Sequence, residues 1–146
     1  MKFEIKKKAV LENLDKTLEI LMTRIKKYFK NDYDINSINL VLEEILVNII
    51  NYGFPECDPG YFKVTLDFVP SNNYLFTKVT DNGIPFNMLE EEDPNIDTPL
   101  EDRVHGGWGI FFVKKLASEV SYKRKNDNNI IELKFTSSNN TAGETI

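Results

Sequence analysis

Residues 35–52 read INSINLVLEEILVNIINY, and this stretch decides how the rest of the chain must fold. Apolar side chains recur at intervals of three and four residues and also fill most of the positions between them. A helix that is apolar on almost all sides is normally buried, with other elements packed around it. Gly53 and Pro55 follow directly and are typical of a helix end. We therefore predict a largely buried helix over about 35–52.

A narrow polar seam interrupts this apolar surface. At about 100° per residue, Asn48 lies about 40° from Glu44, and Ser37 and Asn51 lie about 20° to either side of it. Buried carboxylates and amides are costly unless a partner binds them. A ligand or metal ion would be such a partner, since an asparagine carbonyl oxygen suits magnesium and a glutamate can act as a general base. The simpler alternative is that Glu44 pairs with a lysine while Glu43 faces solvent.

The remaining sequence predicts a sheet and two further helices. Alternation of apolar and polar residues is typical of strands and occurs over 2–9, 61–69, 74–80, 120–125 and 129–136. Amphipathic patterns predict helices over 11–30 and 108–118. This order favours an α+β fold, a two-layer α/β sandwich whose helices cover one face of a mixed, mostly antiparallel sheet. We expect one domain over 1–146, ordered over about 2–136, with a frayed polar tail after Thr136.

Glycines stand at the ends of two predicted elements. Residues 81–83 read DNG and follow a strand, and residues 106–109 read GGWG and precede a helix. Glycines at a helix start let phosphate oxygens approach backbone N–H groups, and the helix dipole favours an anion there. Each stretch alone also fits a simpler interpretation, a tight turn for the first and a flexible loop with a helix cap for the second.

Composition and missing motifs exclude several classes of protein. The formal net charge of -5 argues against a general nucleic-acid binder. The single cysteine, Cys57, excludes an intrachain disulfide and a zinc site of several cysteines. P-loop, Rossmann and protein-kinase catalytic-loop motifs are absent from the sequence. No apolar run approaches the roughly 20 residues of a membrane span, and the first residues do not form a signal peptide, so a cytoplasmic protein is expected.

The seam and the two glycine stretches, in this order, resemble the ATP-binding fold shared by DNA gyrase, a heat-shock chaperone, histidine kinases and MutL, the GHKL or Bergerat-fold ATPases. The short chain looks most like a bacterial branch of anti-sigma factors that are also serine-protein kinases, to which parts of 107–122 are similar. The resemblance covers about residues 3–136. It implies ATP and Mg²⁺ as cofactors, and a sigma factor and an anti-anti-sigma (STAS-type) protein as partners. A homodimer is compatible with it, because the relatives pair through their sheet.

The resemblance also implies a role for individual residues. Glu44 corresponds to the general base, Asn48 to the magnesium ligand, and Asp81 to the residue that accepts a hydrogen bond from the adenine amino group. Gly83 corresponds to the glycine that lets the base pack closely. Residues about 89–106 correspond to a mobile lid. The further nucleotide-binding candidates are Asn51, Arg103, Gly106, Gly107, Trp108 and Gly109, with His105 as a second basic residue of the lid.

Two features depart from the family pattern. Pro85 stands where the motif D-x-G-x-G often has its second glycine, and the lid begins with acidic residues, 90–93, that we expect to point away from a nucleotide. Because of these departures, an alternative function is a binding module that uses ATP without transferring phosphate. Two further alternatives are a histidine-kinase catalytic fragment, whose only histidine would be His105, and an α+β interaction domain that binds no nucleotide.

Overall fold

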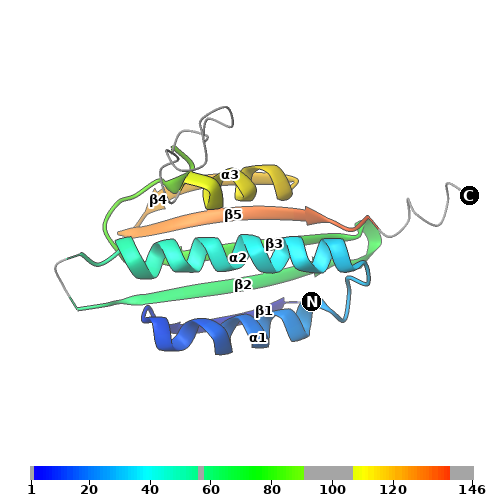
Figure 1. The fold of residues 1–146 in the computed structure, drawn as a ribbon, viewed down its shortest axis with the longest axis horizontal. Helices are drawn as coiled ribbons and strands as arrows, with labels where there is room; N and C mark the ends of the chain where they lie inside the picture. Colours follow the sequence, from blue (N-terminus) through cyan, green and yellow to red (C-terminus); the bar gives the residue numbers. More distant parts are fainter. Residues whose placement is uncertain (1, 56–57, 91–106, 139–146) are drawn as a thin grey trace, which may run out of the picture.

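Five strands form a single sheet in the computed structural model, which describes residues 2–55, 58–90 and 107–138. Their order across the sheet is β1-β2-β3-β5-β4, with the bounds Lys2–Lys8 (β1), Tyr61–Val69 (β2), Tyr74–Asp81 (β3), Glu119–Lys125 (β4) and Asn128–Thr136 (β5). Three helices cover one face of this sheet: Leu14–Ile25 (α1), Asp32–Tyr52 (α2) and Gly107–Leu116 (α3). Figure 1 shows α2 between the other two helices. The predicted two-layer α+β sandwich is confirmed.

All four strand pairs that the structure describes are antiparallel, where we expected a mixed but mostly antiparallel sheet. The direction follows from the connections between the strands. Two helices, α1 and α2, separate β1 from β2, so the chain enters β2 running opposite to β1. The pairs β2–β3 and β4–β5 are hairpins, which are antiparallel by construction. The strands β1 and β4 form the two edges of the sheet.

The β4–β5 hairpin closes on two residues. Asn126 and Asp127 both have positive φ, at 53° and 62°. This is the backbone of a type I′ turn, whose twist matches that of the flanking strands and which asparagine and aspartate tolerate better than most residues. The sequence predicted a strand over 129–136, and this two-residue turn lets β5 begin one residue earlier than expected.

Local contacts explain where the helices begin and end. Asn31 accepts hydrogen bonds from the backbone N–H groups of Tyr33 (2.8 Å) and Asp34 (3.2 Å), so α2 begins earlier than predicted. The predicted helix over 11–30 divides into a 3₁₀ turn, Leu11–Asn13, and the shorter helix α1.

The core lies between α2 and the sheet. On α2, Val41, Leu42, Ile45 and Leu46 have no exposed surface, which agrees with the predicted buried helix. The strand β2 alternates between buried and half-buried residues along its whole length, so one face of the sheet is apolar. No helix within the described residues is long and apolar enough to cross a membrane.

The end of β5 is tied to the start of α2. The backbone N–H and the hydroxyl of Ser138 donate hydrogen bonds to the buried carboxylate of Asp34, at 2.9 Å and 2.8 Å. The N–H of Ser137 donates to the carbonyl of Asn73 at 3.0 Å. We expected the tail to fray after Thr136, and this was wrong for these two residues because Asp34 and Asn73 supply partners. Residues 139–146 lie outside the described residues.

Candidate functional site

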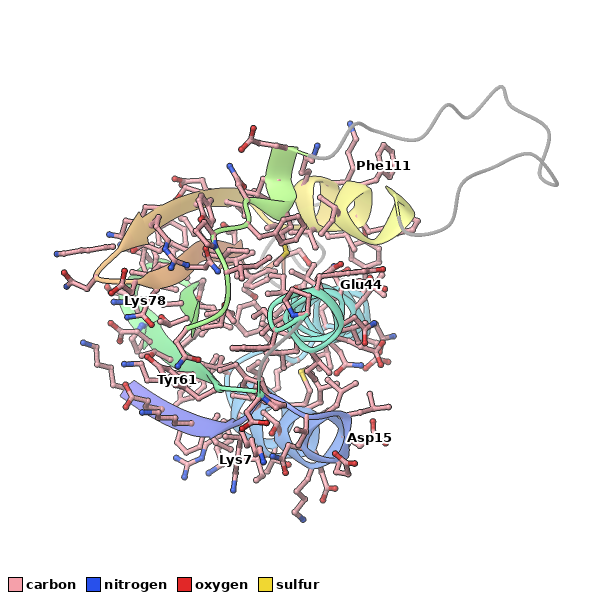
Figure 2. All side chains as sticks on the ribbon, turned by 90° about the vertical axis from the view of Figure 1, so that its left-hand side faces the viewer. Lys7, Asp15, Glu44, Tyr61, Lys78 and Phe111 are labelled. Atoms are coloured by element: carbon pink, nitrogen blue, oxygen red, sulfur yellow. The ribbon has the colours of Figure 1, made fainter. Side chains whose placement is uncertain are left out.

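Glu44 is half-buried on the side of α2 that faces α3 (Figure 2), and Asn48, one helical turn further along α2, is also half-buried. The side-chain amide of Asn48 donates a hydrogen bond to the carbonyl of Glu44 at 2.8 Å, which holds it close to the helix axis. Within the described part of the chain its Oδ1 accepts no hydrogen bond. This leaves a hard carbonyl oxygen for a cation, the kind of ligand that magnesium takes.

The carboxylate of Glu44 lies against Gly109, in the first turn of α3. A Cβ atom at position 109 would overlap Oε2 of Glu44, so only glycine leaves room for this carboxylate. Burial raises the pKa of Glu44, and the nearby charge of Glu43 raises it further. Among the residues described, no lysine lies within ion-pair distance of Glu44, so the simpler alternative of a lysine partner finds no support.

Asp81 ends β3 with a carboxylate that is 4% exposed. Its Oδ1 accepts two hydrogen bonds, from the N–H of Gly83 at 2.9 Å and from the amide of Asn129 at 3.0 Å. No hydrogen bond to Oδ2 occurs among the described residues. Burial raises the pKa of Asp81 although these hydrogen bonds and the Arg124 guanidinium oppose the shift. The site therefore presents one acceptor oxygen to a ligand that carries a hydrogen-bond donor.

Asn129 is the residue that sequence reasoning missed. It is 5% exposed, and its amide also donates to the carbonyl of Ile84 at 2.8 Å. Its Oδ1 accepts from the hydroxyl of Tyr122 at 2.6 Å and from the N–H of Phe86 at 3.2 Å. The alternation of β5 contained the signal, because position 129 has the same parity as the buried residues of that strand, Ile131, Leu133 and Phe135. We had predicted a strand that begins at Asn129, without giving this residue a role in the site.

The loop after β3 is held from three sides. The N–H of Ile84 donates to the carbonyl of Gly53, at the end of α2, and Arg124 of β4 donates to the carbonyl of Gly83, each at 2.9 Å. Asn129 holds the loop from β5. A Cβ atom at Gly83 would lie 2.6 Å from the Gly53 carbonyl oxygen, so the close approach of these two backbones requires glycine. Pro85 is exposed.

The contact between Gly53 and the loop joins the two groups of candidates. Glu44 lies nine residues before Gly53, which is about 13 Å along the axis of α2. The acceptor oxygen of Asp81 thus lies near one end of the helix, and the Glu44–Asn48 pair lies near its middle beside the start of α3. An elongated ligand with a donor group at one end and anionic groups at the other fits this arrangement, because the N-terminus of α3 favours an anion.

For the remaining candidate residues, the structure gives only the element or the exposure, or does not describe the residue. Gly107 is the first residue of α3, and Trp108 is the second. Asn51 is exposed on α2, one turn beyond Asn48. Arg103, His105, Gly106 and the expected lid from residue 91 onward lie outside the described residues. The beginning of that loop, Met88–Glu90, forms a 3₁₀ turn in which Met88 is buried.

No three histidine, cysteine, aspartate or glutamate side chains gather into a metal site within residues 2–55, 58–90 and 107–138. A hydrated magnesium ion that arrives with a nucleotide needs no such cluster, because phosphate oxygens supply most of its ligands. The Oδ1 atom of Asn48 is a suitable protein ligand for such a magnesium ion, because it is a hard carbonyl oxygen. The neighbouring Glu44 carboxylate can orient a water or a hydroxyl group.

Comparison with solved structures places this architecture among known proteins. The structure of the RsbU and RsbW domains of Rv1364c from Mycobacterium tuberculosis matches 93% of the chain with a TM-score of 0.67 and 14% identity. The histidine kinase domain of the blue-light activated histidine kinase EL346 from Erythrobacter litoralis matches 88% with a TM-score of 0.52 and 16% identity. The chain spans 32% of the first protein and 63% of the second. At these identities the likeness concerns the fold.

A search of curated protein sequences found no significant match. The family model described as the histidine kinase-like ATPase domain matches residues 8–135, which include α2, the loop after β3 and the start of α3. This range takes in the polar seam, the aspartate at the strand end and the glycines at the helix start, and the family is one of ATPase domains. The chain belongs to the family of histidine kinase-like ATPase domains.

Proposed function

We propose that this protein binds Mg-ATP and acts as an anti-sigma factor with serine-protein kinase activity. It sequesters a sigma factor and phosphorylates a serine of an anti-anti-sigma protein of the STAS type. The observation that carries the proposal is the position of Glu44. Its carboxylate lies against the glycine start of α3, one helical turn before Asn48, and its pKa is raised by burial. A base with a raised pKa beside a phosphate-binding helix start suits the activation of a hydroxyl nucleophile.

Each residue has a separate role in this proposal. Asp81 accepts a hydrogen bond from the adenine amino group through its Oδ2 atom, and Asn48 binds the magnesium ion through Oδ1. The backbone N–H groups at the start of α3, from Gly107 to Gly109, receive phosphate oxygens. Glu44 then takes the proton of the attacking serine hydroxyl as the oxygen bonds to the γ-phosphorus and the bond to the β,γ-bridging oxygen breaks. Most of the catalysis in phosphoryl transfer comes from such positioning and charge stabilisation.

The proposed partners rest on similarity. Parts of 107–122 are similar to anti-sigma factors that are serine kinases, and one structural neighbour contains an RsbW domain. The second neighbour is a histidine kinase domain, which makes the identity of the accepting side chain the main question.

The test is a transfer assay with γ-labelled ATP and a purified STAS-domain protein. The wild type should label a serine, and Glu44→Gln should reduce the rate at least about 100-fold, the usual contribution of a general base. The variant should bind Mg-ATP nearly as well as the wild type, because the amide keeps the size of the carboxylate. Glu43→Gln, one residue away, is the matched control and should retain transfer. Undiminished transfer in Glu44→Gln would remove the role given to Glu44, and label on a histidine would remove the serine specificity.

A second candidate function is an ATP-binding interaction module without phosphoryl transfer. The exposed Pro85 favours it, since this loop has a proline where the relatives often have a glycine. ATP binding in calorimetry, combined with no transfer to any STAS-domain protein supplied, would favour this function over the first.

A further inference from the structure

Within residues 2–55, 58–90 and 107–138, the helices cover only one face of the sheet and leave the other face open (Figure 1). The strand register determines which side chains lie on that open face, because residues directly opposite in an antiparallel pair point to the same side. Lys6 of β1 is opposite Lys63 of β2, and Lys63 is opposite Thr80 of β3. Thr80 is opposite Ile130 of β5, which is opposite Lys123 of β4. Similar rows precede and follow this one along the strands.

Charge on this open face differs in sign from that of the whole chain. Its eight basic residues are Lys2, Lys6, Lys8, Lys63, Lys78, Lys123, Lys125 and Lys134. Its four acidic residues are Glu4, Asp67, Glu119 and Glu132. Eight lysines and four carboxylates give a formal charge of +4, whereas the chain as a whole carries -5, so the rest of the chain carries -9. The open face is therefore a basic surface on an acidic protein.

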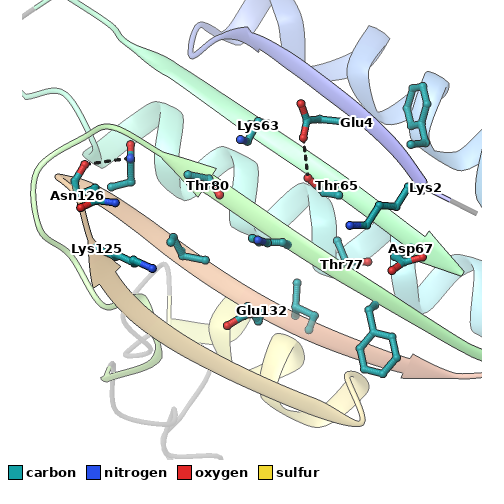
Figure 3. Close-up of a pocket in the computed structure, with 16 residues that line it drawn as sticks. Lys2, Glu4, Lys63, Thr65, Asp67, Thr77, Thr80, Lys125, Asn126 and Glu132 are labelled. Carbon is teal, nitrogen blue, oxygen red and sulfur yellow. Dashed lines mark hydrogen bonds between the residues drawn. The ribbon is translucent and has the colours of Figure 1, made fainter. Parts of the chain in front are cut away.

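The centre of the open face is hollowed, with a volume of about 580 Å³ (Figure 3). Four of the lysines, Lys2, Lys63, Lys78 and Lys125, line this hollow. In the part of the chain that the structure describes, none of these four forms an ion pair.

The three carboxylates of the same hollow already have partners. Glu132 pairs with the Lys123 ammonium at 3.3 Å, and Glu4 accepts a hydrogen bond from the Thr65 hydroxyl at 3.4 Å. Asp67 also has an interaction partner. The lining of the hollow thus has four lysines and three carboxylates, a formal charge of +1, and its lysines are available to a ligand while Glu132 is paired with Lys123.

An aromatic side chain adds apolar contact area to the hollow. Phe76 lines it and is 43% exposed, and its ring meets that of Tyr74 edge-on with 6.0 Å between the centroids. The Lys134 ammonium lies 3.7 Å from the centroid of Tyr74, which fixes the ring from the other side. An exposed aromatic residue among charged residues is typical of protein interfaces.

We infer that the open sheet face binds an acidic surface segment of a partner protein, whose carboxylates enter the hollow and whose apolar side chains contact Phe76. Association of two copies through this face would bring two surfaces of charge +4 together, which opposes a second copy as the occupant. A nucleic acid is a poorer fit, because the face has no arginine, carries interspersed carboxylates and belongs to a chain of charge -5. Electrostatic attraction of this kind accelerates association and decreases with salt.

The experiment uses the full chain and a fluorescent 20-residue poly-L-glutamate peptide as the probe, at low ionic strength. The variant Lys63→Glu/Lys78→Glu/Lys125→Glu should bind the peptide at least about tenfold more weakly than the wild type. The control Lys16→Glu/Lys27→Glu/Lys30→Glu makes the same change of charge on the helix side and should lose less than about threefold. Both variants should keep their thermal stabilisation by Mg-ATP, which shows that they are folded. Carbodiimide cross-links from the peptide should map to Lys63, Lys78 and Lys125.

Several results would overturn the inference. Absence of peptide binding to the wild type would do so, as would equal losses in the two triple variants. Tighter binding of a single-stranded oligonucleotide of equal charge would identify nucleic acid as the preferred occupant. A dimer that only the Lys63/Lys78/Lys125 variant disrupts, measured by sedimentation, would identify a second copy.

Discussion

Asp81 and Asn129 orient each other through hydrogen bonds whose directions are fixed. The Asp81 carboxylate accepts from Gly83 and Asn129 on one oxygen, Oδ1, and turns the other oxygen away from both donors. Asn129 in turn uses both amide hydrogens and receives two hydrogen bonds on its carbonyl oxygen. Because every donor and acceptor of the Asn129 amide is satisfied, this buried network is rigid and presents the remaining acceptor, Oδ2 of Asp81, to a ligand in a defined position.

Asp81→Asn should change the nucleobase preference of the site from adenine towards hypoxanthine, the base of inosine triphosphate. Since Oδ1 must still accept from Gly83 and Asn129, the new amide NH₂ would occupy the place of Oδ2 and oppose the adenine amino donor. Affinity for ATP should fall about tenfold to a hundredfold, whereas inosine triphosphate, which has a carbonyl group at that position, should lose less or gain. Calorimetric titration with both nucleotides measures this change. An unchanged preference for ATP would contradict the role of Asp81.

The same variant should keep the fold stable. Burial raises the pKa of Asp81, so its charged form is less favourable in the folded than in the unfolded protein. A raised carboxyl pKa contributes stability at low pH that is lost as the pH rises through the folded-state value. As the pH rises through the folded-state pKa of Asp81, the wild type should therefore lose the stability that this group contributes, and Asp81→Asn should show no such loss. Thermal melts at several pH values test this, and a variant that unfolds at lower temperature at pH 7 would contradict it.

Asn129→Leu should destabilise the protein strongly. The change keeps the size of the side chain but leaves the Tyr122 hydroxyl, the Phe86 N–H and the Ile84 carbonyl without their partner. We expect the free energy of unfolding to decrease by about 2–4 kcal/mol. Urea denaturation measures it, with Asn128→Ala as the neighbouring control, for which we expect about 1 kcal/mol. Equal decreases in the two variants would mean that the hydrogen bonds of Asn129 contribute no more to stability than those of its neighbour Asn128.

The pH dependence of phosphoryl transfer should respond to Glu43. The charge of Glu43 is the second cause, after burial, of the raised pKa of Glu44. If Glu44 is the base, transfer falls as the pH decreases through its pKa, and Glu43→Gln should shift that fall to lower pH. Rate profiles of the wild type, Glu43→Gln and the distant control Glu19→Gln provide the measurement. A shift to higher pH, or an equal shift in the control, would contradict the assignment.

Sequence reasoning reached some of these residues and not others for a physical reason. Glu44 and Asn48 were visible because a polar seam on an apolar helix stands out from its neighbours, and Asp81 was visible at a strand end. Asn129 and Arg124 were not, since they contact the loop after β3 from 43 and 41 positions away along the chain, and Tyr122 takes part only through its hydrogen bond to Asn129. Such contacts depend on the order of strands, which the sequence pattern did not determine.

Helices α2 and α3 and the strand β3 meet at two glycines, which have different surroundings. A Cβ atom at Gly83 would lie against the backbone carbonyl of Gly53, at 2.6 Å, and this backbone cannot move without disturbing the end of α2. A Cβ atom at Gly109 would meet only the end of the Glu44 side chain, which can rotate away. The glycine at position 83 is thus needed for the fold, and the glycine at position 109 is needed for the position of the Glu44 carboxylate in the site.

Alanine at these two glycines should separate stability from function. Gly83→Ala should lower the free energy of unfolding by about 1–3 kcal/mol, since the close backbone approach is lost. Gly109→Ala should leave stability unchanged or raise it by about 1 kcal/mol, because alanine favours a helix. It should nevertheless weaken transfer, because Glu44 is displaced, and the shorter side chain in Glu44→Asp/Gly109→Ala should restore part of the rate. Thermal melts and transfer assays distinguish these outcomes, and equal destabilisation by both alanines would contradict the account.

The elements themselves were largely predictable, because their periodicities come from local burial. The alternation in β2 and the apolar surface of α2 correspond closely to the observed ranges. The direction of the strands was predicted only in part, since a mixed but mostly antiparallel sheet was expected and all four described pairs are antiparallel. Pairing across β3 and β5 joins distant parts of the chain, and periodicity within one strand contains no information on its neighbour.

At the scale of the whole molecule, the two faces of the sheet have different chemistry. The helix side carries the half-buried Glu44 beside the start of α3 (Figure 2), with Asn48 one turn further along α2 and the buried Asp81 at the end of β3. On the open face, four lysines that form no ion pair within the described residues line a hollow (Figure 3). A nucleotide and a protein partner would therefore bind on opposite sides of one sheet. The central claim is that Mg-ATP binds on the helix side.

An NMR titration of ¹⁵N-labelled protein with Mg-ATP tests this claim most directly. The account predicts saturable shifts with one equivalent of nucleotide, concentrated at the amides of 44–51, 81–86 and 107–111, and little change at Lys63 and Lys78. Absence of shifts at millimolar Mg-ATP, or shifts concentrated around Lys63 and Lys78 on the open face, would contradict it.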